Sequence, residues 1–329
     1  MKSIIKDIEQ GNYKRVYLLY GEESYLKTQY KNKLKAAILP EDDTMNFNGY
    51  EGKGVNVKEV IDQAETMPFF ADKRLIIIEN SGFFKNAAVE LAEYIPQLPE
   101  ETCIVFSEVE VDKRGKLYKA VHNVGRCIQF VRQDEKTLMN WVLARIRKED
   151  KNITSATMKF FLSRTGDDME NISKELEKLL SYTLGRDVIT NEDVAAICTE
   201  RTENKIFDMV NAITTKNQKQ ALDLYYDLLA LKEPPMRILF LITRQFNHLL
   251  QVKALQKQGF EQQEMAEQMK MQSFIVRNYL RQAQNLTLEG VRAALEECVA
   301  METAVKTGQM NDEMSVELLI VKYSKKEFS

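Results

Sequence analysis

The sequence has little of what metal centres and thiol chemistry require. Its 329 residues include two histidines and four cysteines, and no two cysteines are spaced as CxxC. Structural zinc sites draw their ligands from closely spaced cysteines and histidines. We therefore expect no metal and no cofactor. Scattered single cysteines are typical of a reducing compartment.

The scarcity of histidine also limits the catalytic chemistry. His122 and His248 stand far apart in the sequence, and no Ser/His/Asp or Cys/His arrangement can be assembled around them. Hydrolase chemistry of that kind is therefore not expected, whereas carboxylate-based chemistry stays open. We predict that the chain has no catalysis of its own.

Long apolar runs are missing as well. No stretch approaches the length that a membrane-spanning helix needs. The N-terminal segment MKSIIKDIEQGNYK becomes charged too early for the hydrophobic part of a secretion signal. We expect a cytoplasmic protein that contacts no membrane.

The charge balance is close to even. Net charge is −3 and the pI is about 5.8, so the global signature of a nucleic-acid binder is absent, although a local basic patch remains possible. Apolar residues make up 44% and charged residues 29%, which is ordinary for a globular protein. A chain of this length predicts two or three domains, each large enough for its own core.

Short apolar runs punctuate the first part of the chain. Each is flanked by charge and rich in β-branched or aromatic residues, which is typical of strands buried on both faces. Amphipathic helical patterns lie between the runs, and this alternation predicts an α/β domain with a mostly parallel sheet over residues 1–133. The expected strands are residues 16–20, 45–50, 75–79, 103–106 and 127–131.

After Val131 the pattern becomes helical. Residues 134–204 predict a small lid-like helical bundle, and residues 205–329 predict an all-α domain with a central helix after the KEPP break at 232–235. The stretch ERTENK (200–205) resembles a linker. The expected helix caps and stops are Asp134, Thr154, Gly166, Asp167 or Asp168, Thr190 and Gly259.

One segment nearly matches a phosphate-binding loop. GEESYLKT follows the first strand, and Gly21, Lys27 and Thr28 fit the pattern G-x-x-x-x-G-K-[ST], but Leu26 replaces its second glycine. A branched side chain would stand where backbone must approach phosphate, and Glu22 and Glu23 add negative charge. A chance match, a vestigial loop and a working site are the three interpretations, and we expect no nucleotide.

A second segment, ETMPFFADKR (65–74), carries consecutive aromatics. Phe69 and Phe70 cannot both face one core from a regular element, and Pro68 interrupts the element before them. At least one ring is therefore a candidate for exposure and for binding a partner's apolar pocket. The alternative is that both rings pack inside their own domain.

A basic cluster lies in VDKRGKLYK (111–119). Lys113, Arg114 and Lys116 could face DNA phosphates or an acidic partner, or they could form an ordinary solvated face. Asp112 is predicted to cap the helix that contains Leu117.

Taken together, the chain resembles the delta subunits of bacterial DNA polymerase III clamp loaders, which are non-hydrolysing relatives of AAA+ ATPases. The resemblance spans the full chain, and no single segment decides it. Its carriers are VYLLYGEESYL at the first strand, MPFFADKRLIII (67–78), VDKRGKLYK, GDDMENISKELEKL (166–179) and the helical C-terminal third with RQFNHLL (244–250).

The resemblance implies a role and a set of partners. It implies that Met67, Pro68, Phe69 and Phe70 bind the ring-shaped sliding clamp (beta), and that the chain opens the ring for loading onto primed DNA without hydrolysing ATP. It further implies an AAA+-like first domain and a C-terminal collar domain that joins gamma/tau ATPase subunits and delta-prime. Clamp-binding peptides of this family often begin with glutamine, and Glu65 stands at that position.

Two other functions stay open at this point. An AAA+ ATPase with a deviant phosphate loop would bind ATP through Lys27. A helical adaptor or nucleic-acid-binding module would bind DNA in a salt-dependent manner.

Overall fold

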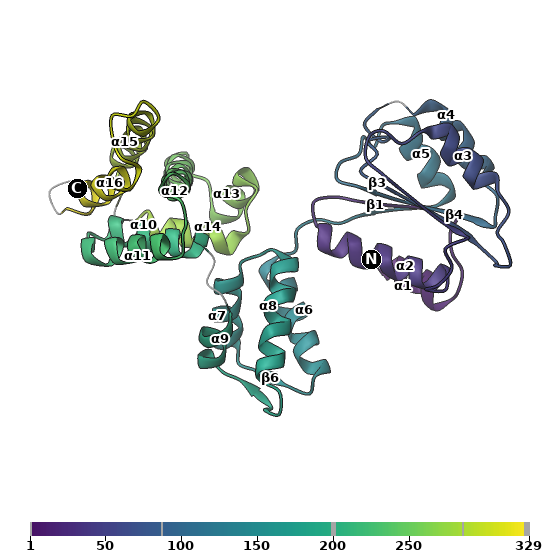
Figure 1. Cartoon of the computed structure of the whole chain (residues 1–329), viewed down its shortest axis with the longest axis horizontal. Helices are drawn as coiled ribbons and strands as arrows, with labels where there is room; N and C mark the ends of the chain where they lie inside the picture. The colour runs from purple at the N-terminus through teal and green to yellow at the C-terminus, as the bar shows by residue number, and fades with distance from the viewer. Residues whose placement is uncertain (1, 87, 199–201, 285, 326–329) are drawn as a thin grey trace. The chain divides into compact units, whose positions relative to one another are not determined.

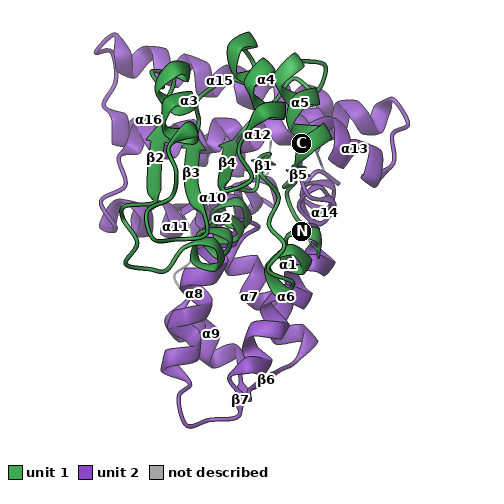
Figure 2. Cartoon of the chain, turned by 90° about the vertical axis from the view of Figure 1, so that its right-hand side faces the viewer, with its two compact units in different colours: residues 1–133 green, residues 134–329 purple. Residues whose placement is uncertain are grey.

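The computed structural model describes residues 2–86, 88–198, 202–284 and 286–325. The chain divides into two compact units, residues 1–133 and 134–329 (Figure 2). The second expected domain boundary, near residue 204, stays a prediction, and residues 200 and 201 of the linker-like stretch lie outside the described residues.

The first unit is built on a parallel sheet of five strands in the order β2-β3-β4-β1-β5 (Figure 2). Every ladder in this sheet is parallel, and the central strands are buried along almost their whole length. The expected strands are confirmed, with bounds shifted by a few residues. They run over β1 (Val16–Tyr20), β2 (Phe47–Glu51), β3 (Arg74–Glu79), β4 (Thr102–Glu108) and β5 (Arg126–Gln129).

Helices cover both faces of this sheet (Figure 1). One face packs against α3 (Val57–Glu65), α4 (Val89–Tyr94) and α5 (Lys116–Val124), with Val60, Leu91 and Val121 in the shared core. A short 3₁₀ turn (Ile95–Gln97) follows α4 at Pro96. Helices α1 (Lys2–Glu9) and α2 (Ser24–Ile38) lie on the other face.

Helix α1 was not expected from the sequence. Ile4 and Asp7 are its buried residues, and the Asp7 carboxylate accepts hydrogen bonds from the Arg126 guanidinium and from the Tyr17 hydroxyl. Burial opposes ionisation of Asp7, but these bonds outweigh it and hold the carboxyl pKa below its usual range. A paired carboxylate therefore fastens this short helix to β1 and β5.

The second unit begins with a helical bundle. Its helices are α6 (Glu135–Lys148), α7 (Ser155–Thr165), α8 (Met169–Tyr182) and α9 (Asn191–Ile197). The expected caps are confirmed: Asp134, Thr154 and Asp168 each accept a backbone N–H of the first helical turn, and Thr190 forms a capping box. Gly166 ends α7 with a φ of 79°.

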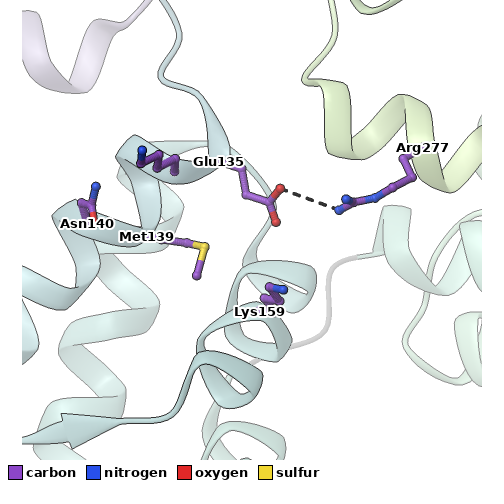
Figure 3. A pocket seen from close by; sticks show the side chains of 6 residues that line it. Glu135, Met139, Asn140, Lys159 and Arg277 are labelled. Carbon is purple, nitrogen blue, oxygen red and sulfur yellow. Dashed lines mark ion pairs between the residues drawn. The ribbon is translucent and has the colours of Figure 1, made fainter. Parts of the chain in front are cut away.

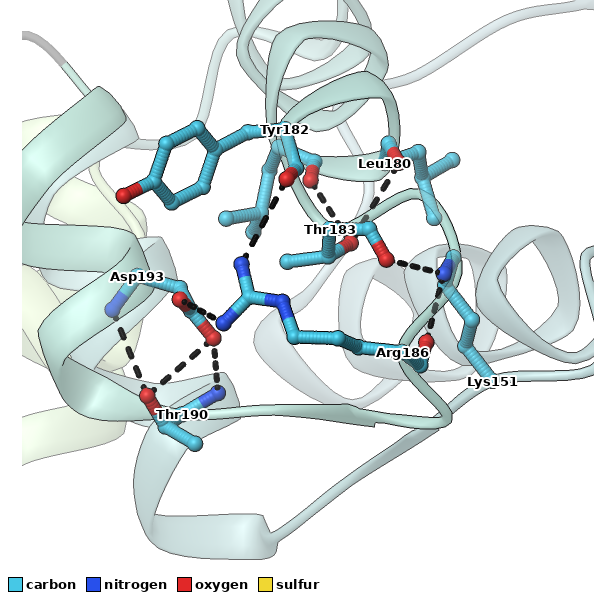
Figure 4. A network of polar contacts seen from close by, with 8 residues as sticks. Lys151, Leu180, Tyr182, Thr183, Arg186, Thr190 and Asp193 are labelled. Carbon is cyan, nitrogen blue, oxygen red and sulfur yellow. Dashed lines mark hydrogen bonds and ion pairs between the residues drawn. The ribbon is translucent and has the colours of Figure 1, made fainter.

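The bundle also contains a two-stranded parallel ladder that the sequence did not predict. Strands β6 (Asn152–Ile153) and β7 (Val188–Ile189) are two residues each. A polar network closes this end of the bundle (Figure 4). The buried Lys151 ammonium donates to the Thr183 and Arg186 carbonyls, both at 2.6 Å, and the Arg186 guanidinium pairs with Asp193 at 2.8 Å.

The remaining elements in the described part of the second unit are all helices, as expected. The longest helix, α12, begins at Pro235 and is followed by a residue of positive φ, Gly259, as predicted. Its buried face contacts α10, α14, α15 and α16, so it is central to its core. The helices are α10 (Thr202–Thr214), α11 (Gln218–Ala230), α12 (Pro235–Lys257), α13 (Gln262–Met269), α14 (Ser273–Gln282), α15 (Leu288–Lys306) and α16 (Asp312–Ser324).

Candidate functional site

The aromatic loop, residues 66–73, connects α3 to β3. Helix α3 ends at Glu65, and the Thr66 hydroxyl donates to the Asp62 carbonyl at 3.0 Å. Pro68 has no backbone N–H and fixes its own φ, so the helix cannot continue through it. The chain re-enters regular structure at Arg74, the first residue of β3.

Both phenylalanines of this loop face solvent. Phe70 is 96% exposed, Phe69 is 56% exposed and Met67 is 73% exposed, while Pro68 is half-buried. The two rings lie edge-to-face with centroids 4.6 Å apart. Packing of both rings inside the domain, the alternative left open by the sequence, is therefore wrong, and the loop presents an apolar projection.

The backbone of the aromatic loop is held by the side chain of Asn46. The Phe69 N–H donates to Asn46 Oδ1 at 2.6 Å, and Asn46 Nδ2 donates to the Phe69 carbonyl at 2.9 Å. Phe70 has a φ of 49°, in the left-handed region. A non-glycine residue pays about 1–2 kcal/mol for that conformation, so the surroundings must impose it.

Glu65 has a defined partner at the edge of this loop. Its carboxylate accepts a hydrogen bond from the Tyr94 hydroxyl at 2.6 Å. Burial and this bond raise the pKa of Tyr94, so the phenol stays neutral and remains the donor. The side chain at the expected glutamine position is thus hydrogen-bonded to a residue of α4.

The segment resembling a phosphate loop is packed into the sheet. Gly21 has a φ of 124°, and a Cβ placed there would lie 2.1 Å from the Phe130 carbonyl oxygen. Its N–H donates to the Glu108 carbonyl at 3.1 Å, and the Glu23 N–H donates to the Phe130 carbonyl at 3.2 Å. Gly21 is therefore required by close packing between β1 and its neighbours.

Lys27 points into this packing. Its ammonium donates to the Glu108 carbonyl at 2.8 Å, and the side chain is 5% exposed. Burial lowers the pKa of Lys27, and the charges of Glu108 and Glu79 oppose that shift. Leu26 is buried beside it, while Thr28 is exposed.

The same region contains the buried carboxylate of Glu108. Glu108 Oε1 accepts from the Ser81 N–H at 3.0 Å and from the Ser81 hydroxyl at 2.6 Å. In an open parallel sheet, a ligand binds beyond the carboxyl ends of the strands where the strand order reverses. Here that place, between β1 and β4, holds protein groups bonded to one another, which supports the vestigial interpretation of the loop.

The basic cluster is partly engaged by its own domain. Arg114 pairs with Asp112 at 3.2 Å, and Lys113 donates to Gln129 Oε1 at 3.2 Å; Lys116 is exposed at the start of α5. The predicted helix cap is wrong, because Gly115 is the N-cap of α5 and Asp112 Oδ1 instead accepts the Arg114 N–H. The carboxylate forms a turn before the helix begins.

A shallow pocket of about 250 Å³ lies in the second unit (Figure 3). Glu135 and Arg277 pair across it at 3.7 Å, and Lys136, Met139, Asn140 and Lys159 complete the lining. The ion pair makes it a polar surface hollow rather than an apolar ligand site. Within the described residues, no group of three or more His, Cys, Asp or Glu side chains could hold a metal ion.

The structure separates the three sets of predicted site residues rather than joining them. The aromatic loop precedes β3, whereas residues 21–28 follow β1 and the basic cluster follows β4. Because the strands are parallel, the first lies at the opposite end of the sheet from the other two. The sequence does not single out Asn46, because residues 45–50 predict a strand and its contact with Phe69 spans 23 residues.

Comparison with known proteins agrees with this architecture. Residues 17–130 match the family model of the DNA polymerase III delta subunit, and residues 203–323 match that of its C-terminal domain. Together these models cover well over half of the chain. The chain therefore belongs to the DNA polymerase III delta subunit family, and the predicted membership and fold class are confirmed.

Individual relatives cover nearly the whole sequence. DNA polymerase III subunit delta of Bacillus subtilis is 27% identical over 98% of this chain and 96% of its own length. The probable DNA polymerase III subunit delta of Aquifex aeolicus is 22% identical over 83% of each. The solved structure of the B. subtilis DNA clamp loader delta protein superposes with a TM-score of 0.75 at 25% identity, covering 99% of both chains.

These findings make the chain a DNA polymerase III clamp-loader subunit homologue of the delta type. None of the helices in the described ranges is long and apolar enough to cross a membrane.

Proposed function

We propose that this chain binds the sliding clamp through Met67, Pro68, Phe69 and Phe70 and opens the ring for loading onto primed DNA. The carrying observation is the consecutive, solvent-exposed phenylalanine pair on a backbone-anchored loop, in a member of the delta family. Large exposed apolar projections are rare on isolated domains and are typical of partner anchors.

The chemistry of the loop defines the kind of pocket that it fits. Two edge-to-face rings and a thioether form an apolar body without a charged group. Burying such a surface is favourable by about 25 cal/mol per Å² of apolar area removed from water, and this requires a concave apolar surface on the partner. The clamp pocket is therefore proposed to receive Phe69 and Phe70, with Met67 at its rim.

Ring opening follows from binding energy in this proposal. A ligand shifts an equilibrium only by its differential affinity for the two states. If the chain binds the opened clamp about a hundredfold more tightly than the closed one, the open fraction rises by the same factor while the closed form predominates. No ATP hydrolysis by this chain is needed for that step.

The remainder of the clamp loader supplies the other partners. We propose that gamma/tau ATPase subunits and delta-prime join this chain through residues 205–329, and that primed DNA is bound in the assembly. Exposed apolar side chains on the helices of this region, including Phe240 on α12 and Val299 on α15, support a surface that partner subunits cover. The cytoplasmic location stays a prediction.

The proposal is tested by ring opening. A fluorophore and quencher are attached across one clamp interface, and the chain alone is added. We expect fluorescence to rise with the parent chain and to stay at baseline with a folded Phe69→Ala/Phe70→Ala variant. Baseline fluorescence with a parent chain that binds the clamp would refute opening, and absence of binding would refute the proposal as a whole.

A further inference from the structure

Asn46 is buried beneath the aromatic loop with all its hydrogen-bonding groups engaged. It is 1% exposed and directly precedes β2. Its backbone N–H donates to Asp43 Oδ1 at 2.9 Å, and its carbonyl accepts the Leu75 N–H at 2.8 Å. The residue therefore has a fixed position relative to the sheet before its side chain contacts the loop.

The side-chain amide of Asn46 has only one orientation that satisfies its neighbours. Nδ2 donates to Asp43 Oδ2 at 2.7 Å and to the Phe69 carbonyl at 2.9 Å, while Oδ1 accepts the Phe69 N–H at 2.6 Å. A carboxylate and a carbonyl only accept, and an N–H only donates, so a flipped amide would lose all three bonds. Asp43 thus fixes the orientation of the Asn46 amide that bonds to Phe69.

This contact replaces the pairing that a neighbouring strand would give Phe69. Both backbone groups of Phe69 are satisfied by one rigid side chain, and the next residue is Phe70 with its φ of 49°. An unrestrained Phe70 would leave the left-handed region, because that conformation is disfavoured for side chains with a Cβ. Phe69 is fixed on one side of Phe70, and β3 begins at Arg74 on the other, so the backbone of Phe70 has little freedom to leave this conformation.

We infer that Asn46, oriented by Asp43, is a positioning residue that presents Phe69 and Phe70 to the clamp in their binding conformation. This inference rests on the proposed function of the loop. Neither Asn46 nor Asp43 needs to contact the clamp. Their contribution is preorganisation: a loop that is already ordered loses less conformational entropy when it binds.

The first test compares Asn46→Ala with the parent in two measurements on the full chain. Hydrogen exchange of the free protein reports the order of residues 66–73, and calorimetry reports clamp affinity. We expect faster exchange in this segment and an affinity reduced on the order of tenfold. Asn171→Ala is the matched control, because Asn171 Nδ2 also donates to a backbone carbonyl, that of Thr165 at 2.8 Å, but in the other unit.

The second test exchanges the two partners. Asn46→Asp alone should bind the clamp no better than Asn46→Ala, because the new carboxylate faces both Asp43 and the Phe69 carbonyl. Adding Asp43→Asn restores a donor between positions 43 and 46 and keeps an acceptor for the Phe69 N–H. We expect this double variant to recover part of the affinity, which loss of bulk stability alone would not produce.

The outcomes separate this inference from the function on which it rests. Unchanged exchange at residues 66–73 in Asn46→Ala, or faster exchange with unchanged clamp affinity, overturns the positioning role while Phe69→Ala/Phe70→Ala still abolishes binding. Equal binding by the parent and Phe69→Ala/Phe70→Ala instead overturns the proposed clamp contact, and the positioning role with it.

Discussion

Two segments that border the five-stranded sheet differ in whether they bury or expose the residues that stand out in the sequence. Segment 21–28, which runs from the turn after β1 into the start of α2, matches a known motif in most of its letters, yet Leu26 is buried and Lys27 bonds to the Glu108 carbonyl. The aromatic loop at 66–73 has no catalytic motif, yet it exposes Phe69 and Phe70. The motif match alone does not show this difference in exposure.

The difference lies in where the backbone groups find their partners. In the first loop, the amides of Gly21 and Glu23 bond to carbonyls of neighbouring segments, so these groups are not offered to a phosphate. In the second, one buried asparagine satisfies the Phe69 backbone, which leaves the rings outside. The partners of the backbone N–H and C=O groups therefore decide which groups of each segment remain available to a ligand or a partner protein.

The largest effect on clamp binding is expected from removing one exposed ring. Phe70→Ala should weaken clamp binding by about 2 kcal/mol or more, roughly thirtyfold, because buried aromatic anchors carry most of the energy of an interface. Calorimetry measures it. Leu184→Ala, which truncates an 82% exposed side chain of the other unit, is the control and should bind like the parent. Equal loss in both variants would contradict a specific anchor.

Gly21 should matter for folding rather than for ligand binding. Gly21→Ala is expected to lower the free energy of unfolding by about 2–4 kcal/mol, because the new Cβ meets the Phe130 carbonyl at a positive φ. Denaturant titration measures this change. Gly52→Ala is the control for strain without a clash, since Gly52 has a φ of 87° and open space around it. A loss no larger than in Gly52→Ala would contradict the packed loop.

The pH dependence of folding stability tests whether Lys27 is buried. Burial lowers its pKa below the ordinary 10.5, so between the two values the unfolded chain binds more protons and stability rises with pH. Lys27→Met should change the free energy of unfolding at pH 7 by less than about 1 kcal/mol, because it removes the bond to the Glu108 carbonyl together with the cost of burying the ammonium, and that carbonyl keeps the Gly21 N–H as a donor. It should also flatten stability between the folded pKa and pH 10.5. Saturable ATP binding by the parent, lost in the variant, would instead support the deviant ATPase.

The smallest effect is expected at the basic cluster. Lys113→Ala/Arg114→Ala should change DNA affinity of the isolated chain by less than about threefold, since exposed, internally paired charges contribute little. Fluorescence anisotropy at several salt concentrations measures it. A large, salt-dependent loss would favour the nucleic-acid-binding alternative.

Much of the fold was predictable because its signals are local. Apolar runs located the strands of the main sheet, and side-chain caps such as Asp134 and Thr154 located helix starts. Helix α1 was missed because it is short and is held by a distant partner, Arg126. The two-residue strands β6 and β7 were missed because so few residues carry no detectable period.

The candidate site was only partly predictable for the same reason. Exposure of an aromatic at 69–70 followed from adjacency and from Pro68, but exposure of both rings did not. The role of Asn46 depends on a contact with Phe69 across 23 residues, and no sequence spacing reveals such a contact. Asp112 was assigned as a cap although the nearer Gly115 starts the helix, so even a local rule can misplace a boundary.

The most direct test of this account is calorimetric titration of the cognate sliding clamp into three folded chains: the parent, Lys27→Met and Phe69→Ala/Phe70→Ala. We predict that the parent and Lys27→Met bind alike and that the phenylalanine variant shows no measurable binding. Retained binding by the phenylalanine variant, or its loss in Lys27→Met, would contradict the proposal that the aromatic loop, and not segment 21–28, binds the clamp.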